Sequence, residues 1–212
     1  MKSKGGIIIT VVLIGLGVLF KYVIWPKFAV EAIQKVSGWE DARSEITAGI
    51  QTELTTGLST QIDLPADKKD ALLKCLVDKK IEFLNGTECK YYYAEGTTSE
   101  AEHLKNQEEC LKKANMEAKD EENFIACALV NVPNTWALAA AAIKKEFGAE
   151  MPAATRDCFV DGMVKAFDQF GCTLLNKEAK KAEEILTNPE KCMADSRIAS
   201  EIETLNGKCL AK

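Results

Sequence analysis

The 212-residue chain has few of the side chains on which most catalytic and nucleic-acid-binding sites depend. It contains one histidine, His103, and three arginines, and its net charge is −5. Binding to nucleic-acid phosphates requires lysines and arginines clustered on one face of a protein. Acidic and basic residues are instead interspersed along this chain, as on a solvated helical surface. The composition therefore argues against nucleic acid as a partner.

The signature motifs of common catalytic sites are also missing. The chain has no Gly-x-Ser-x-Gly elbow, no phosphate-binding Walker or Gly-x-Gly-x-x-Gly loop, no His-Glu-x-x-His pair and no Cys-x-x-Cys-His haem site. His103 lies in a polar stretch, Ala-Glu-His-Leu-Lys, where an exposed histidine is the ordinary case. Adjacent acids such as Glu108 and Glu109 are typical of solvent-facing helices. We therefore predict a non-enzymatic protein with no catalytic residue and no cofactor.

Cysteine, in contrast, is abundant and regularly spaced. The eight cysteines form two sets of four, with gaps of 13, 20 and 16 residues in the first set and 13, 19 and 16 in the second. The sequence Cys75-Leu-Val-Asp in the first set corresponds to Cys158-Phe-Val-Asp in the second. This self-similarity predicts a duplicated unit. The sets are Cys75, Cys89, Cys110 and Cys127, and Cys158, Cys172, Cys192 and Cys209.

The cysteine spacing favours disulfides over a metal site. Zinc and iron–sulfur sites take their ligands from close pairs such as Cys-x-x-Cys, often with histidine. Here the shortest gap is 13 residues, and His103 lies outside the pattern of the two sets. An even number of cysteines at repeated spacing indicates disulfides, which persist in oxidising compartments. We therefore expect no metal ligands and four disulfides outside the cytosol.

Four cysteines in one unit allow three pairings. If a unit is a bundle of three helices that run up, down and up, its first and third cysteines share one end. We favour this arrangement, although a middle segment without a helix would make the outer helices antiparallel and the pairing nested, first with fourth and second with third. Each bridge over about 35 residues would contribute about 3–4 kcal/mol. The favoured pairs are Cys75–Cys110, Cys89–Cys127, Cys158–Cys192 and Cys172–Cys209.

An apolar run near the amino terminus predicts a membrane anchor. Residues 7–25 are almost continuously apolar and follow a short basic head, Met1-Lys-Ser-Lys. A helix of this length rises about 28 Å, close to the hydrocarbon thickness of a bilayer. We expect residues 1–26 to form an uncleaved signal-anchor helix that crosses the lipid bilayer. The alternative is a signal peptide cleaved after Ala32.

The basic head also predicts the topology. Because lysines next to a span stay on the cytoplasmic side, the cysteine-bearing part lies outside the cytoplasm in both readings of the apolar run. We predict a single-pass protein of the bacterial inner membrane with its carboxy-terminal domain in the periplasm.

The rest of the chain predicts an all-α fold with tandem repeats. Residues 27–64 are expected to form a helical stalk, with a capping box at Ser37-Gly-Trp-Glu40. Its apolar residues recur every fourth position, as a stripe that packs on the first repeat or on a partner helix. The stripe consists of Ala42, Ile46, Ile50, Leu54, Leu58 and Ile62. The four-cysteine helical-bundle repeats are expected at 65–131 and 152–212, joined by an alanine-rich helix at 132–151 that forms their shared core.

Local signals predict where the helices of the repeats begin and end. Asn85-Gly86 is a left-handed helix stop, Asn106 is the N-cap of a helix that carries Cys110, and Asn188-Pro189 is a helix start in its preferred form. In the second repeat, the Lys-, Glu- and Ala-rich stretch 174–187 predicts the middle helix. The third helix of this repeat, which starts at Asn188-Pro189, is expected to end at Asn206-Gly207.

Two groups of side chains are candidates for recognition. Tyr91, Tyr92 and Tyr93 follow Cys89 in a predicted loop and offer rigid amphipathic surface of the kind enriched at interfaces. A second group of apolar residues would line a cavity for a small ligand, unless it is ordinary core. This group consists of Trp136, Leu138, Phe159, Met163, Phe167 and Phe170.

These features favour one function and leave two others open. The anchor, the stalk and the disulfide-stapled scaffold predict a non-enzymatic adaptor or structural subunit of an envelope assembly, with other membrane or envelope proteins as partners. The alternative is a helical carrier or binding module for a small apolar ligand. A redox chaperone would need a reducible, accessible disulfide.

Overall fold

The computed structural model describes residues 39–40, 42–89, 100–148 and 151–210, which form helices and connecting turns. Beyond an isolated bridge between Leu175 and Leu186, these residues contain no strand. The expected all-α fold is therefore confirmed. The elements in chain order are α2 (Arg43–Thr56), η1 (Leu58–Thr60), α3 (Ala66–Asn85), α4 (Glu100–Lys113), α5 (Met116–Asn131), η2 (Trp136–Ala139), α6 (Ala140–Phe147), α7 (Ala153–Gln169), η3 (Ala182–Glu184), α8 (Pro189–Met193) and α9 (Ser196–Leu210).

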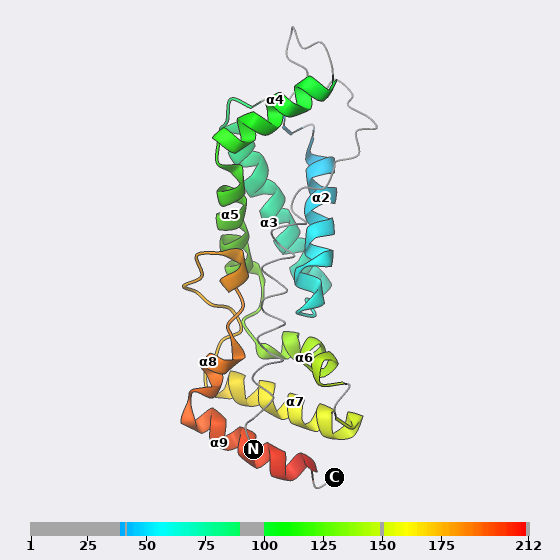
Figure 1. Cartoon of the computed structure of the whole chain (residues 1–212), viewed down its shortest axis with the longest axis vertical. Coiled ribbons are helices and arrows are strands. Elements are labelled where there is room, and N and C mark those ends of the chain that lie inside the picture. Colours follow the sequence, from blue (N-terminus) through cyan, green and yellow to red (C-terminus); the bar gives the residue numbers. More distant parts are fainter. Residues whose placement is uncertain (1–38, 41, 90–99, 149–150, 211–212) are drawn as a thin grey trace.

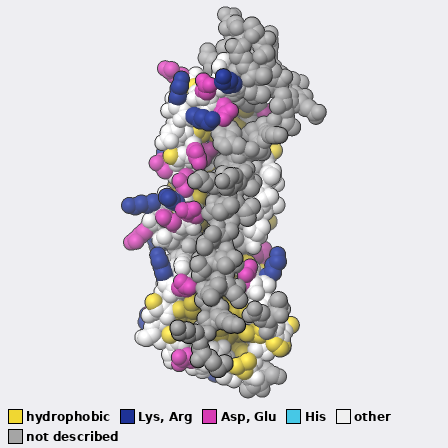
Figure 2. All heavy atoms as spheres, in the orientation of Figure 1, with side chains coloured by type: hydrophobic (Ala, Val, Ile, Leu, Met, Phe, Trp, Pro, Cys, Tyr) yellow, Lys and Arg dark blue, Asp and Glu magenta, His cyan; other side chains and the backbone are white. Residues whose placement is uncertain are grey.

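The molecule is elongated, with two sets of helices that lie in different directions (Figure 1). Helices α2, α3 and α5 run along the long axis, and α4 lies across their upper end. Helices α7 and α9 lie side by side across the lower end, with α6 next to α7. Figure 2 shows acidic and basic side chains interspersed along the upper part of this face, whereas apolar side chains gather at the lower end.

Helix α2 packs against the rest of the chain through the predicted apolar stripe. All six stripe residues are buried, with exposed fractions between 1% at Ala42 and 8% at Ile46 and Ile50. Helix α3 provides most of the surface that they cover. Burial of each large aliphatic side chain contributes about 1.5–3 kcal/mol. Of the two partners predicted for the stripe, the structure shows packing within the chain, on α3, which lies in the segment predicted as the first repeat.

The start of α2 differs from the predicted capping box. The helix begins at Arg43, and Glu40 accepts a hydrogen bond from Arg43 Nε at 2.6 Å. Ser37, the expected N-cap, lies outside the described residues. Trp39 fixes this end of α2 to the end of α3, because its indole Nε1 donates to the carbonyl oxygen of Cys89 at 2.8 Å.

Helices α3 and α5 form a hairpin, with α4 placed across its end instead of between them (Figure 1). Helix α4 runs through Asn106, which is therefore not an N-cap as predicted. The turn from α4 to α5 is made at Asn115, whose φ of 57° lies in the left-handed region. Helix α3 ends at Asn85 as expected, but Gly86 has φ −80° and is not a left-handed cap.

Helices α7 and α9 form a second hairpin. The stretch between them was predicted to contain a middle helix at 174–187, and this prediction is wrong. Asn176 N donates to Ile185 O at 2.8 Å and Thr187 N donates to Leu174 O at 2.8 Å, so the segment doubles back on itself. Four of its apolar side chains are buried, which outweighs the helix propensity of its Lys, Glu and Ala residues. These are Leu174, Leu175, Ala182 and Ile185.

For the last helices, the sequence predicted the first boundary correctly and the final boundary wrongly. Asn188 is an N-cap, since its side chain accepts from Glu190 N at 2.8 Å and Pro189 holds the first helical position. The helix that it starts, α8, ends at Met193, and a separate helix, α9, follows. Helix α9 runs on through Gly207 to Leu210, so the predicted stop at Asn206-Gly207 is wrong.

The connection between the hairpins is anchored on α7. Asp168 accepts hydrogen bonds from Trp136 N at 2.8 Å and from Thr135 Oγ1 at 2.5 Å. The Trp136 ring packs edge-on against Phe167, with 4.9 Å between ring centroids. Trp136 and Ala139 are buried, but α6 contains no buried residue. Only Val132 and the η2 part of the predicted segment 132–151 therefore belong to the buried core that this segment was expected to form.

The predicted anchor at residues 7–25 lies outside the described residues, and the repeat boundaries stay predictions. In the part of the chain that the structure describes, no single helix has the length and apolar character needed to cross a bilayer. One pair of segments, Met116–Asn131 with Trp136–Phe147, meets those criteria only when taken together, and it bends by 113° at the break.

Candidate ligand-binding groove

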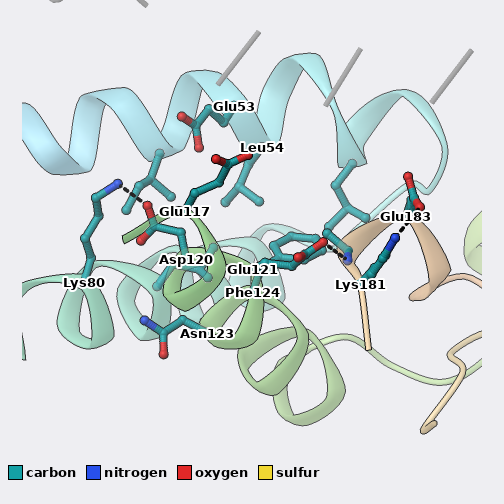
Figure 3. Close-up of a pocket in the computed structure, with 14 residues that line it drawn as sticks. Glu53, Leu54, Lys80, Glu117, Asp120, Glu121, Asn123, Phe124, Lys181 and Glu183 are labelled. Atoms are coloured by element: carbon teal, nitrogen blue, oxygen red, sulfur yellow. Dashed lines mark hydrogen bonds and ion pairs between the residues drawn. The ribbon is translucent and has the colours of Figure 1, made fainter. Parts of the chain in front are cut away.

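A groove opens where α2, α3 and α5 meet the η3 turn (Figure 3). Its volume is about 370 Å³, within the range of small-molecule sites. The four segments come from both halves of the chain, because η3 lies between α7 and α9 in sequence yet contacts α5. Its lining consists of Ile50, Glu53, Leu54, Leu58, Leu76, Lys80, Glu117, Asp120, Glu121, Asn123, Phe124, Lys181, Ala182 and Glu183.

The floor of the groove is apolar and belongs to the core. Ile50 and Leu54 come from the buried stripe of α2, and Phe124 comes from the facing side of α5. Each of these side chains is less than one-tenth exposed. Because these side chains are held by the packing of α2 on the hairpin, the floor is formed by the fold itself and needs no ligand to order it.

One wall carries an ion pair that joins two helices. Lys80 Nζ of α3 lies 2.9 Å from Asp120 Oδ2 of α5, and both side chains are largely shielded, with exposed fractions of 21% and 30%. Partial burial strengthens such a pair relative to the exposed pairs elsewhere on the surface. The positive charge of Lys80 is therefore engaged within the wall.

The far end of the groove is closed by the η3 turn. The Glu121 carboxylate accepts a hydrogen bond from Ala182 N at 2.9 Å, so one side chain of α5 fixes the turn in place (Figure 3). Lys181 Nζ lies 3.9 Å from Glu183 Oε1 within the same turn. Both lysines of the lining thus have a carboxylate partner.

Two further carboxylates of the lining have no such cation. Glu53 extends from α2 and Glu117 from α5 into the space between these helices (Figure 3). Neither forms an ion pair with another residue of the described ranges. Burial raises the pKa of Glu53, an effect partly offset by Lys80 and reinforced by Asp120. Five carboxylates face two lysines, so the groove has an excess of acidic groups.

Asn123 adds a polar group that the chain leaves unsatisfied. Its side chain lines the groove, is only 7% exposed, and its Nδ2 has no hydrogen-bond acceptor among the described residues. A buried donor without an acceptor costs about 1–3 kcal/mol. Such groups are rare in folded proteins and call for an explanation.

The groove has the chemistry of a binding site. Its lining combines an apolar floor with acidic side chains and contains no cysteine, histidine or serine nucleophile. Within the described ranges, no group of three or more His, Cys, Asp and Glu side chains is arranged to hold a metal ion. The geometry therefore supports recognition of an apolar body that carries positive charge.

The eight predicted disulfide cysteines are all bridged, but the favoured pairing is wrong. The bonds are nested: the first cysteine of each set pairs with the fourth and the second with the third. In the second set the reason is the one given for the alternative, because the segment 174–187 doubles back and is not a middle helix. In the first set the helix α4 is present but lies across the end of the hairpin formed by α3 and α5. The pairs are Cys75–Cys127, Cys89–Cys110, Cys158–Cys209 and Cys172–Cys192.

The residues predicted for recognition are not among the described lining of the groove. Tyr91, Tyr92 and Tyr93 lie outside the described residues, so the prediction for them is not tested. His103, expected to be an ordinary histidine, lies in α4. The six apolar residues predicted to line a cavity are in the lower part of the fold, where Trp136, Met163 and Phe167 are buried and the others are packed against the core. Sequence reasoning missed the groove because its lining comes from segments that are far apart in the chain, from Ile50 to Glu183, and only the α2 stripe among them has a clear pattern.

Comparisons with protein-family models, with curated proteins and with solved structures find no match to this chain. The case for a function therefore depends on the groove, the disulfides and the sequence.

Proposed function

We propose that the protein is a non-enzymatic, membrane-anchored adaptor or structural subunit of an extracytoplasmic envelope assembly. The proposal places residues 7–25 in the inner membrane and the disulfide-bonded helices in the periplasm. Its support is the basic head, the apolar run and the eight bridged cysteines. Disulfides that persist in an oxidising compartment hold each hairpin in one shape, and a surface held in this way loses little entropy when it binds.

The observation that carries this proposal is the incomplete burial of α6. The helix contains Ile143, Phe147 and three alanines, yet none of its residues is buried. Its apolar side chains rest on α7, where Phe147 packs edge-on against Phe159 with 6.2 Å between ring centroids. Ile143 and Phe147 are half-buried and Ala141 is exposed, so part of the apolar surface of α6 is left for a partner protein to cover.

Native mass spectrometry of the full chain, extracted gently from its own membranes without reductant, tests the adaptor proposal. We expect defined complexes with other membrane or envelope proteins. An Ala141→Asp variant, which places a charge at an exposed apolar position of α6, should lose those complexes, whereas Lys145→Asp, which changes an exposed polar position of the same helix, should retain them. A protein that stays monomeric or forms only homo-oligomers at native abundance would contradict the proposal.

A second candidate function is a carrier or binding module for a small ligand, and the groove favours it. A volume of about 370 Å³ and a floor of buried apolar side chains are the ordinary properties of small-molecule sites. The same mass-spectrometric experiment distinguishes the two functions. A small-molecule adduct on an otherwise solitary chain supports the carrier, and a protein complex without an adduct supports the adaptor.

A further inference from the structure

We propose that the groove between α2, α3, α5 and η3 is the docking site for residues 27–36 of the same chain, the stretch that joins the predicted anchor to Trp39. These residues, which we call the juxtamembrane segment, lie outside the described residues. The inference rests on the uncleaved anchor of the proposed function, since cleavage after Ala32 would remove most of the segment.

The juxtamembrane segment has the sequence pattern of an amphipathic helix. Apart from Val30, its apolar residues occur at positions i, i+1, i+4, i+5 and i+8, which share one face of a helix, and its polar residues share the opposite face. A helix of ten residues is marginal in water unless its apolar face packs on another surface. The apolar face consists of Phe28, Ala29, Ala32, Ile33 and Val36, and the polar face of Lys27, Glu31, Gln34 and Lys35.

The groove offers a surface that complements this pattern. Its floor is formed by Ile50 and Leu54 of α2 and Phe124 of α5, between walls that carry the charged side chains (Figure 3). The lining contains five carboxylates and two lysines, which gives a net charge of −3. The juxtamembrane segment contains two lysines and one glutamate, which gives a net charge of +1. An apolar face flanked by lysines therefore suits an apolar floor between acidic walls.

The segment joins the described part of the chain close to the groove. Trp39 is fixed beside the end of α3, because its indole Nε1 donates to the carbonyl oxygen of Cys89 at 2.8 Å. The undescribed stretch therefore meets the fold just before α2. Ile50, where the lining begins, lies seven residues after the first residue of α2, at a helical rise of about 11 Å.

The length of the segment matches this distance. A helix from Val36 back to Phe28 rises about 12 Å, so a helix that runs antiparallel to α2 brings Phe28 to the level of Ile50. Ser37-Gly38 contains residue types that favour the turn this path requires. Because the segment is tethered next to the groove, its effective concentration there is on the order of millimolar, with which any free ligand must compete.

The test places a photoreactive side chain on each face of the segment, in the full chain in phosphatidylcholine nanodiscs. Phe28→benzoylphenylalanine probes the apolar face, and Gln34→benzoylphenylalanine is the matched control on the polar face. Irradiation, digestion, reduction and peptide mass spectrometry locate the crosslinks. We expect position 28 to react with α2 or α5 residues of the lining with a yield about tenfold higher than position 34, because the two side chains point to opposite sides of a helix.

A pair of charge variants tests the apolar face itself. Ile33→Asp should lower the yield from position 28 about tenfold, because a carboxylate buried on an apolar floor without a partner is costly. Gln34→Asp adds the same charge to the polar face and should leave that yield unchanged. An unaltered disulfide map shows that each variant is folded.

Three results would overturn docking within the chain. In a mixture of unlabelled and ¹⁵N-labelled chains, crosslinks found only between the two kinds of chain would place the segment in the groove of a second copy. Attachment of position 28 to lipid would place the segment on the bilayer surface. Equal yields at the lining from positions 28 and 34 would leave the groove open for the small ligand of the second candidate function.

The intact mass before irradiation separates failure of the inference from failure of the proposed function. A mature chain that begins after Ala32 lacks both the anchor and most of the segment, so both proposals would fail. A full-length chain without lining crosslinks would remove the inference alone, because the partner complexes depend on α6 and are measured independently.

Discussion

Gly162 of α7 lies against the side chain of Leu205 of α9. A methyl group at Gly162 would lie 2.8 Å from Leu205 Cδ1 and closer still to Cδ2, with Cγ at 3.1 Å. Carbon atoms that are not bonded to each other do not approach this closely, so the whole end of Leu205 would have to move. The absence of a side chain at Gly162 is therefore a condition for the packing of the second hairpin.

We predict that Gly162→Ala destabilises the protein and that Gly207→Ala does not. Alanine gains up to about 1 kcal/mol over glycine inside a helix, but at Gly162 the overlap with Leu205 costs about 1–3 kcal/mol. A methyl group at Gly207 in α9 meets no atom within 4 Å. At this position only the higher helix propensity of alanine affects the stability. Thermal unfolding of the full chain with its disulfides intact should show changes of opposite sign, and two stabilising changes would contradict the packing.

Removal of the Asp168 carboxylate should loosen the link between the two hairpins. Asp168→Ala leaves Trp136 N and Thr135 Oγ1 without their acceptor, which we expect to cost about 1 kcal/mol and to alter the near-ultraviolet dichroism of Trp136. Asp161→Ala, on the same helix, breaks an ion pair with Lys144 at a carboxylate that is 60% exposed. That control should change stability by less than about 1 kcal/mol and leave the dichroism unchanged.

The nested disulfides give a prediction that a proteolytic map can check. Digestion without reductant should release Cys75 joined to Cys127 and Cys158 joined to Cys209, with the inner bridges at Cys89–Cys110 and Cys172–Cys192. Replacement of either outer pair by serine should lower the free energy of unfolding by about 3–4 kcal/mol, as expected for loops of this length. Peptides that join Cys75 to Cys110 would contradict the structure.

The difference between predicted and observed pairing shows where sequence reasoning fails. Cysteine spacing established which residues are bridged, but the pairing depends on the path of the chain between them. Two local features decide that path: the left-handed turn at Asn115, which places α4 across the hairpin end, and the doubling back of the chain between Leu174 and Thr187. The turn agrees with the tolerance of asparagine for the left-handed region. The doubling back contradicts helix propensity, which is a weak guide when tertiary packing competes with it.

Predictions held where a repeating pattern or a single side chain decides the outcome. Periodicity identified the buried stripe from Ala42 to Ile62, because every fourth residue faces the same side of a helix. Asn188 is an N-cap because its own side chain supplies the acceptor. The groove had no comparable signal, since Glu53 and Glu117 line the same groove only when α2 and α5 pack on α3.

The half-buried carboxyl of Glu53 predicts a pH dependence of stability. Burial raises its pKa above the ordinary value, so its protonated form stabilises the fold and that stability is lost as pH rises through the raised pKa. Glu53→Gln should therefore be at least as stable as the unaltered chain at neutral pH. The advantage should shrink as pH falls towards the ordinary carboxyl range. Unfolding temperatures measured between mildly acidic and neutral pH test this, and a constant difference would contradict it.

The carboxyl of Asp195, at the start of α9, predicts a dependence of stability on pH that is opposite in sign to that of Glu53. Hydrogen bonds from the Arg197 side chain and from Arg197 N lower the pKa of Asp195 to about 2. Its contribution to stability is present above the ordinary carboxyl pKa and is lost as pH falls through about 2. Arg197→Met should raise the pKa towards the ordinary value but not reach it, because the bond from the backbone of residue 197 remains. Carbon-detected NMR of the Asp195 carboxyl measures the midpoint.

The control for Asp195 is Lys208→Met, which removes one positive charge from the last turn of the same helix. Lys208 lies at the opposite end of α9 from Asp195, so the midpoint should stay near 2 in this variant. If both variants raise the midpoint equally, the general charge of α9 lowers the pKa. If only Arg197→Met raises it, the cause is the direct hydrogen bond, and α9 begins with a side-chain cap that is present in the folded chain at every pH above about 2.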